Sequence, residues 1–385
     1  MPDFIPGLQL NETYYQQAVR PILERHFPGL AYSAGLVGYG SDVLGYDTPV
    51  SRDHMWGPRL VLFLEPREFE TTRAAVLQRL RTELPLKICG YSTHFGKADE
   101  ADGGTRVLLE VEHGPVDPLI TFTTLDGFCL DELGLPASSL PSTPDWLAFP
   151  QQNLLEVTAG SVYHDGLGLE DLRRRFACYP RDVWLYLLAA QWMLISQEEA
   201  FVGRAWQAGD GLGSRVVAAR QVDRLVHLCF LMEKRYAPYS KWLGTAFKRL
   251  EGCAGMGPLL EQVLAADDFN ERDRCLGQAY SLAARMHNAL GITPALSSDT
   301  RTYSGWHLLR AGVDAVELDD PRNARPFQCI FGERFASAIR AAISDPQVLS
   351  LPPGLGSVNQ FLAESSSALQ SGDFCRRIGG VLKAL

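Results

Sequence analysis

Two short groups of residues have the types and spacing that could handle a phosphate and a metal ion. Gly40 and Ser41 form a Gly-Ser turn after an apolar run, and Asp53 lies shortly before a second apolar run at residues 59–64. Glycine lets the backbone approach a phosphate closely, and N–H groups with a serine hydroxyl can cradle its oxygens. A carboxylate at the mouth of a buried strand can ligate Mg²⁺. The stretch therefore predicts a phosphate-and-metal site around Gly40, Ser41 and Asp53.

This spacing resembles the signature of the nucleotidyltransferase fold, which is Gly-Ser, a loop, and then Asp-x-Asp or Asp-x-Glu. The longer string Gly-Ser-Asp-x-x-Gly-x-Asp…Ser-x-Asp-His-x-Trp-Gly-Pro-Arg, residues 40–59, is similar to one bacterial subgroup, a domain of unknown function called DUF4037. The resemblance implies an α+β fold, with a nucleotidyltransferase-like mixed sheet and helices followed by an all-helical bundle domain. It also implies a reaction. A nucleoside monophosphate would pass from ATP or another nucleoside triphosphate to a small-molecule hydroxyl, with Mg²⁺ or Mn²⁺ as cofactor.

One position departs from the family pattern. Two residues after Asp53, where the family has a second carboxylate, this chain has Met55. A thioether cannot replace a carboxylate as a Mg²⁺ ligand, because Mg²⁺ requires hard oxygen donors. An extended segment would point residues 53 and 55 to the same side, so we expect at most one well-held metal ion. The alternative function is a catalytically degenerate protein that binds a nucleotide or another small ligand.

Further site residues are expected near this stretch. A strand over residues 106–112 would place Glu110 and Glu112 on one face, where either could be the third metal carboxylate of the fold; the alternative is a solvated sheet face. Arg59 could bind a phosphate through its planar guanidinium, or form an ion pair with a nearby acid. Trp56 could stack on a base, although a packing role is favoured.

The helical half of the chain supplies the remaining candidates. It is similar to the helical domain of antibiotic nucleotidyltransferases, which provides a carboxylate base and basic residues for phosphate. By that similarity Glu198 or Glu199 is a candidate catalytic base, and Arg204 and Lys241 are candidate nucleotide ligands. The alternatives are an ion pair with an arginine of the bundle for either glutamate, and a solvated lysine at a helix start. Glu199 and Arg204 are both expected to be buried, because their neighbours are apolar.

The positions of proline, glycine and serine residues predict the domain organisation of the chain. Residues 1–135 are expected to form the nucleotidyltransferase-like domain, 136–179 a connection that is rich in proline and serine, and 180–385 the helical domain. Pro180 is expected to open a helix that runs to about residue 207. Other expected helices cover residues 12–27, 67–82, 214–234 and 332–343, with two more within 256–290, and other expected strands cover 59–64, 86–95 and 119–125.

The overall composition and net charge limit the classes of partner that the chain is expected to bind. The chain has 385 residues, of which 46% are hydrophobic and 21% charged, and its net charge of -9 disfavours binding nucleic acid through a broad basic surface. Its 8 cysteines form no Cys-x-x-Cys pair, which is typical of reduced thiols in a cytoplasmic protein. No apolar run is long enough to cross a membrane. The expected partners are therefore a nucleotide and an unidentified small-molecule acceptor, and the oligomeric state stays open.

Overall fold

The computed structural model describes residues 2–52, 55–303, 327–361 and 372–384. The chain divides into two compact units. Unit 1 comprises Met1–Asp145, Phe149–Ala177 and Ser366–Val381, and unit 2 comprises Trp146–Ala148, Cys178–Ser365 and Leu382–Leu385. No helix in these described ranges is both long and apolar enough to span a bilayer.

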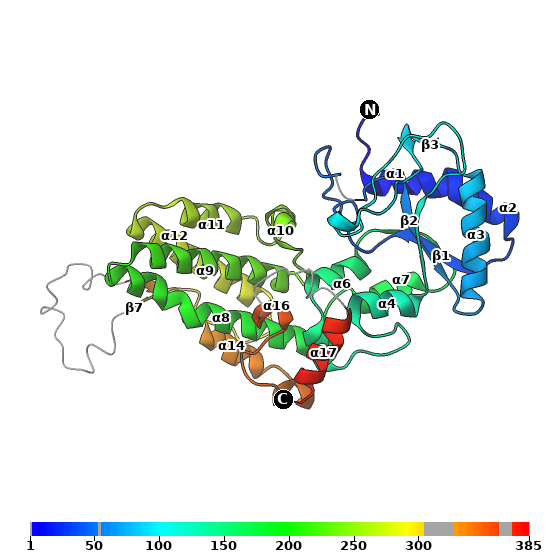
Figure 1. The fold of residues 1–385 in the computed structure, drawn as a ribbon. Coiled ribbons are helices and arrows are strands. Elements are labelled where there is room, and N and C mark those ends of the chain that lie inside the picture. The colour runs from blue at the N-terminus through cyan, green and yellow to red at the C-terminus, as the bar shows by residue number, and fades with distance from the viewer. Residues whose placement is uncertain (1, 53–54, 304–326, 362–371, 385) are drawn as a thin grey trace, which may run out of the picture. The chain divides into compact units, whose positions relative to one another are not determined.

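Unit 1 is built on a four-stranded mixed sheet with the strand order β5-β2-β1-β6. Figure 1 labels two strands of this sheet, β1 and β2. β1 runs antiparallel to both β2 and β6, whereas β2 and β5 are parallel. The strands are β1 (Tyr32–Leu36), β2 (Arg59–Leu64), β5 (Leu119–Thr123) and β6 (Ser161–Asp165), and a small hairpin consists of β3 (Lys87–Ile88) and β4 (Tyr91–Ser92).

Every residue of β2 is buried, as its continuous apolar run predicts. Leu60, Leu62 and Leu64 pack into a core with apolar residues of the N-terminal helices and of α3 (Phe69–Glu83). Phe63, which points to the opposite face, meets Phe128 of α4 (Leu125–Leu133) edge to face at 5.4 Å between ring centroids. The central strand is therefore covered on both faces, which fixes the position of its first residue.

The N-terminal helical segment begins earlier than expected and changes geometry near its proline. It consists of α1 (Gly7–Tyr14), a π-helical turn η1 (Tyr15–Val19) and α2 (Arg20–His26). Pro21 lies at the start of α2, but the residues before it are helical as well, so Pro21 stands inside a continuous helical segment. Because proline has no N–H, one α-helical bond to the preceding turn is lost, and the π turn lies at this point.

Two expectations about unit 1 are wrong. Residues 106–112 form no strand. Leu108 makes an isolated bridge to Phe95, flanked by two backbone hydrogen bonds, and the carbonyls of Phe95 and Gly96 accept from the Arg106 guanidinium. The connection expected over 136–179 is largely folded into unit 1, because residues 161–165 pair with β1 as the fourth strand. The remaining elements of this region are η2 (Glu100–Asp102), α5 (Thr143–Ala148), α6 (Gln151–Thr158), α7 (Leu169–Phe176) and, from the C-terminal segment, α17 (Gly372–Leu382).

The described part of unit 2 is helical, apart from one small two-stranded antiparallel sheet. α8 begins directly after Pro180, as the sequence predicts, and packs along α9. The described helices are α8 (Arg181–Gln207), α9 (Gly211–Met232), α10 (Ser240–Phe247), α11 (Met256–Ala265), α12 (Phe269–Ala289), α14 (Glu333–Arg340), α15 (Pro346–Ser350) and α16 (Val358–Phe361), and the small sheet pairs β7 (Arg301–Tyr303) with β8 (Phe327–Cys329). The expected fold class, a mixed α+β sheet domain followed by a helical domain, is thus confirmed.

Candidate functional site

The Gly-Ser loop lies at one edge of the sheet of unit 1. β1 ends at Leu36, and its antiparallel pairing with β2 brings that end beside the start of β2. β5 begins at the same edge, because Arg59 is in register with Leu119 of the parallel pair. The loop of residues 37–58 and the segment that leads into β5 therefore meet at this edge.

A buried ion pair holds the loop to β2. The guanidinium of Arg59 donates from Nε to Oδ2 of Asp42 at 3.0 Å, and from Nη2 to Oδ1 of Asp42 at 2.7 Å and to the carbonyl of Tyr39 at 2.8 Å. Burial alone would lower the pKa of Arg59, but the Asp42 carboxylate more than offsets this and raises it. Of the two roles open to Arg59, its geometry supports an ion pair with a nearby acid, here Asp42.

Gly40 occupies a position that only glycine fits. Its φ of +133° is rare for other residues, and a Cβ would lie 2.3 Å from Oδ1 of Asp42 and 2.4 Å from Nη2 of Arg59. The next residue, Ser41, is half-buried, and its hydroxyl donates to the carbonyl of Ser51 at 3.3 Å. This long bond leaves the hydroxyl able to turn toward another acceptor.

The far side of the loop is fixed by a second carboxylate. Oδ2 of Asp47 accepts from the backbone N–H of Gly7 at 2.7 Å and from Nε1 of Trp56 at 2.9 Å. Trp56 is buried, and its ring stacks on Phe4. Its role is therefore packing, the favoured alternative.

The expected metal ligand Asp53 lies outside the described residues. Its neighbour Met55 has φ of +50°, so the extended geometry expected over residues 53–55 is wrong at Met55. The hydroxyl of Tyr39 donates to the Met55 sulfur. Because the backbone is left-handed here, alternation does not decide where the side chain at position 55 points relative to that of Asp53.

The described carboxylates do not fit a magnesium site. Glu110 forms an ion pair with Lys87 at 2.5 Å, Glu112 is exposed, and Asp42 is neutralised by Arg59. Within the described ranges, no group of three or more histidine, cysteine or acidic side chains is close enough to hold a metal ion. We therefore derive no step of a reaction through a metal.

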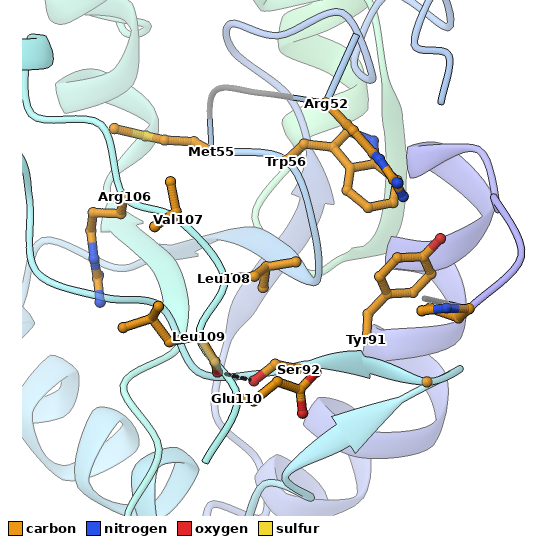
Figure 2. A pocket seen from close by; sticks show the side chains of 12 residues that line it. Arg52, Met55, Trp56, Tyr91, Ser92, Arg106, Val107, Leu108, Leu109 and Glu110 are labelled. Atoms are coloured by element: carbon orange, nitrogen blue, oxygen red, sulfur yellow. Dashed lines mark hydrogen bonds between the residues drawn. The ribbon is translucent and has the colours of Figure 1, made fainter. Parts of the chain in front are cut away.

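A cavity of about 230 Å³ opens beside the loop (Figure 2). In Figure 2, Arg52 and Trp56 lie on one side, Met55 and Arg106 on the other, and Val107 and the leucines that follow it between them. Val107 is 52% exposed and Leu109 is 47% exposed, although both are apolar. The full lining is Pro2, Arg52, Met55, Trp56, Gly90, Tyr91, Ser92, Arg106, Val107, Leu108, Leu109 and Glu110. No pattern in the sequence indicates this cavity, because the alternation over residues 106–112 is that of an ordinary strand.

In unit 2 the two candidate bases are held by local partners. Glu199 is buried, as expected, and its carboxylate accepts from the backbone N–H groups of Ile330, Phe331 and Gly332 at 2.5, 3.0 and 3.1 Å. Burial raises its pKa to about 7, although these three bonds favour the charged form. Glu198 forms ion pairs with Arg220 and Arg224 at 2.9 and 2.8 Å. Glu198 therefore has the alternative role, an ion pair with arginines of the bundle, and not that of a free base.

Arg204 and Lys241 are both exposed. Burial was expected of Arg204 and is wrong, because the residue falls on the outer side of α8, where its guanidinium lies 5.8 Å from the ring centre of the half-exposed Phe201. The ammonium of Lys241 lies 5.1 Å from the ring centre of Trp242. Both cations are accessible to solvent, and both belong to unit 2, whereas Ser41 belongs to unit 1.

A buried carboxyl pair in unit 1 was not expected from the sequence. The side chain of Glu132 on α4 is hydrogen-bonded to that of Glu156 on α6, and burial, followed by the charge of Glu156, raises the pKa of Glu132 to about 9. Nε2 of Gln152 donates to Glu156 at 2.8 Å. The carbonyl of Glu156 accepts from the N–H of Gly38, so α6 also supports the start of the Gly-Ser loop.

Comparison with known proteins adds a family match. Residues 146–243 match DUF4037, a domain of unknown function. The resemblance stated from the sequence is confirmed for this segment, which runs from α5 into α10; the string at residues 40–59 lies outside it.

Among solved structures, the chain is similar to a nucleotidyltransferase-like protein from Exiguobacterium sibiricum 255-15. The two are 13% identical over 79% of this chain and 89% of the other, with a TM-score of 0.29. A TM-score this low supports no conclusion about the present chain. No curated protein matches it.

Proposed function

We propose that this chain transfers a nucleoside monophosphate from ATP or another nucleoside triphosphate to a hydroxyl of a small molecule. The observation that carries the proposal is the turn at Gly40 and Ser41. It stands at the sheet edge where β1 ends and β2 and β5 begin, and a side chain at position 40 is excluded by both conformation and contact. In the sequence, Asp53 lies between this turn and β2.

The proposed reaction balances without a redox partner. The acceptor oxygen attacks the α-phosphorus, a new P–O bond forms, and the bond to the pyrophosphate oxygen breaks. Pyrophosphate leaves, and the hydroxyl proton passes to water. Positioning and neutralisation of charge supply most of the catalysis in such transfers. Backbone N–H groups near Gly40 and the Ser41 hydroxyl are the groups proposed to bind the triphosphate.

Binding of nucleotide is the first test. Calorimetry and thermal denaturation with ATP and with GTP, each with and without Mg²⁺ or Mn²⁺, should show binding that depends on Ser41. Ser41→Ala should weaken it by about tenfold, the effect of losing one hydrogen bond to a charged group. Ser138→Ala, at an exposed position of unit 1, is the control and should change nothing. Absence of binding for both nucleotides in the wild-type protein would overturn the proposal.

Met55 favours the second candidate function, a degenerate member that binds nucleotide without transfer. The sulfur of Met55 accepts from Tyr39, and it offers no oxygen where the related pattern has a carboxylate. Met55→Asp should then raise the affinity for Mn²⁺ in the presence of nucleotide, as counted by metal titration. Two bound metal ions in the wild-type protein would contradict this, since another residue would already supply the second ligand.

A further inference from the structure

We propose that a second cavity, which lies between α8, α14 and the turn at Pro353 and Gly354, binds a short aliphatic carboxylate. We call it the α8–α14 cavity. Its walls come from residues 186–193, 336–340 and 353–354, which all belong to unit 2 and all lie within the described ranges. Figure 1 shows α14 beside α8, and the two helices pack on each other. The binding proposed for this cavity does not depend on the nucleotide transfer proposed above.

The dimensions of the α8–α14 cavity favour a small, elongated ligand. Its volume is about 240 Å³. An apolar cavity of about 150 Å³ can take up benzene, and pockets for drug-sized ligands have roughly 300–1,000 Å³. The wall on α8 runs from Tyr186 to Met193, a rise of about 10 Å along the helix. An extended chain of about eight carbons has a similar length.

The helical walls favour an apolar ligand body. Tyr186, Ala189 and Met193 lie three and four positions apart on α8, so they form one stripe of that helix. Ala189 and Ala336, the latter on α14, are 4% and 1% exposed, and their small side chains leave space between the packed helices. The flexible thioether of Met193 can adapt to the outline of a ligand. An aliphatic chain would therefore meet mainly carbon and sulfur atoms along these walls.

The third wall is a loop held in place by the Tyr186 hydroxyl. This hydroxyl donates to the carbonyl of Pro352 at 2.8 Å and accepts from the N–H of Gly356 at 3.3 Å. Between these two contacts lies Gly354, with φ of +76°, where a Cβ would lie only 3.1 Å from Cγ of Met193. The loop thus closes the cavity against α8, and both contacts of the Tyr186 hydroxyl are to the protein backbone.

One end of the cavity is cationic. α8 and α14 run antiparallel, because Ser196 donates to the carboxylate of Glu333, whereas Arg181 donates to the carbonyl of Ala342 at 3.3 Å. Arg340, in the last turn of α14, therefore lies toward the N-terminal end of the α8 wall, opposite the end at Met193. A ligand with a charged group at one end of an apolar chain matches this polarity.

The guanidinium of Arg340 lacks a countercharge. Its Nη2 donates to the carbonyl of Leu349 at 3.4 Å, a long bond to a neutral acceptor. Its Nη1 is buried and has no hydrogen-bond partner, and no carboxylate of the described ranges forms an ion pair with it. A buried donor without a partner is costly, most of all on a charged group. A carboxylate on the ligand would supply both the acceptor and the countercharge.

Three ligands with the same chain and different end groups test the proposal. Octanoate, 1-octanol and octylamine are anionic, neutral and cationic, and their affinities are measured by calorimetry and ligand-observed NMR without nucleotide or metal. We expect octanoate to bind at least about fivefold more tightly than 1-octanol, through charge-assisted hydrogen bonds, and octylamine to bind most weakly. Equal binding of all three, tightest binding of octylamine, or no saturable binding of octanoate would overturn the proposal.

Variants that fill the cavity locate the binding. Ala336→Leu adds carbon atoms to a buried wall and should abolish binding of octanoate and of 1-octanol. If this variant does not fold, Ser337→Phe fills the cavity from an exposed position of its lining. Ala341→Leu and Ala341→Phe add the same side chains at an exposed position outside the lining and should bind as the wild-type protein does. Unchanged binding in the folded cavity variants would refute the location.

A second pair of variants tests the charge. Arg340→Gln should lower the affinity for octanoate to that for 1-octanol, and retained binding of 1-octanol shows that the variant is folded. Arg235→Gln removes the same charge from an exposed position of unit 2 outside the lining and should keep the preference for octanoate. A preference that survives in Arg340→Gln would show that this guanidinium does not bind the carboxylate.

The results distinguish this inference from the proposed function. If octanoate binds as expected and neither ATP nor GTP binds, the α8–α14 cavity is a ligand site and the proposed transfer is wrong. If nucleotide binds in a manner that depends on Ser41 and octanoate does not bind, the nucleotide site stands and the assignment of the α8–α14 cavity is wrong.

Discussion

At the residue scale, the Asp42–Arg59 ion pair should be the most costly polar contact of the loop to break. The two side chains are 4% and 10% exposed, so Asp42→Asn would leave a buried guanidinium without its countercharge. We expect a loss of about 3–5 kcal/mol in the free energy of unfolding, measured by urea denaturation. The double variant Asp42→Leu/Arg59→Met should regain part of this loss.

An exposed ion pair of the same unit provides the comparison. Arg174 and Asp171 pair on α7 with side chains that are 69% and 75% exposed. Asp171→Asn should cost only about 0–1 kcal/mol, because solvent already screens this pair. A similar cost for Asp42→Asn and Asp171→Asn would show that the Arg59 pair is not buried in solution.

Gly40 and Gly29 separate contact from backbone strain. Both have positive φ, but a Cβ at Gly29 meets no atom within 4 Å, whereas at Gly40 it meets the Asp42–Arg59 pair. Gly29→Ala should therefore cost about 1–2 kcal/mol from conformation alone. Gly40→Ala should cost about 2–4 kcal/mol, because overpacking adds to the strain. Equal shifts in the urea midpoint would contradict the close packing at Gly40.

At the scale of elements, Glu199 ties α8 to the segment that leads into α14. Its pKa is raised from 4.5 to about 7 by burial, so the folded state binds a proton that the unfolded state releases. This contribution to stability is fully present below pH 4.5 and is lost as the pH rises to about 7. Removing it with Glu199→Gln should flatten the pH dependence of the urea midpoint in that window.

The difference between the pH profiles of Glu199→Gln and the wild-type protein separates the contribution of Glu199 from those of the other titrating groups. Burial also raises the pKa of Asp273 to about 6, so the wild-type profile contains more than one contribution. Glu261→Gln, on an exposed position of α11, should leave the profile unchanged. A wild-type profile that is preserved in Glu199→Gln would refute the assigned role of Glu199.

At the scale of the whole molecule, the boundary of unit 1 predicts which fragments fold. β6 pairs with β1 along residues 33–36, and α6 supports the loop through the carbonyl of Glu156. A fragment of residues 1–145 lacks both elements and should show no cooperative urea transition. A fragment of residues 1–177 contains the complete four-stranded sheet and should show one. Equal cooperativity of the two fragments, followed by circular dichroism, would contradict this division.

Local patterns in the sequence determined much of this architecture. The apolar run at residues 59–64 predicts a strand buried on both faces, and Pro180 predicts the start of α8; both are confirmed because run length and proline chemistry act within a few residues. The Gly-Ser turn is likewise found directly after β1. Burial of Glu199 followed from its apolar neighbours on the same helix.

Only the tertiary structure decided which distant groups meet. Residues 161–165 join β1 as a strand, although they lie beyond a proline-rich stretch, because sheet pairing depends on partners far apart in the chain. Arg59 pairs with Asp42 across a loop whose path no periodicity encodes. Residues 106–112 alternate like a strand but have no neighbouring strand to pair with along their length, and the same irregular path leaves Val107 and Leu109 exposed in the cavity. The sequence specifies which residue types occur and at what spacing. Contacts between residues that are far apart in the chain decide which of them form a site.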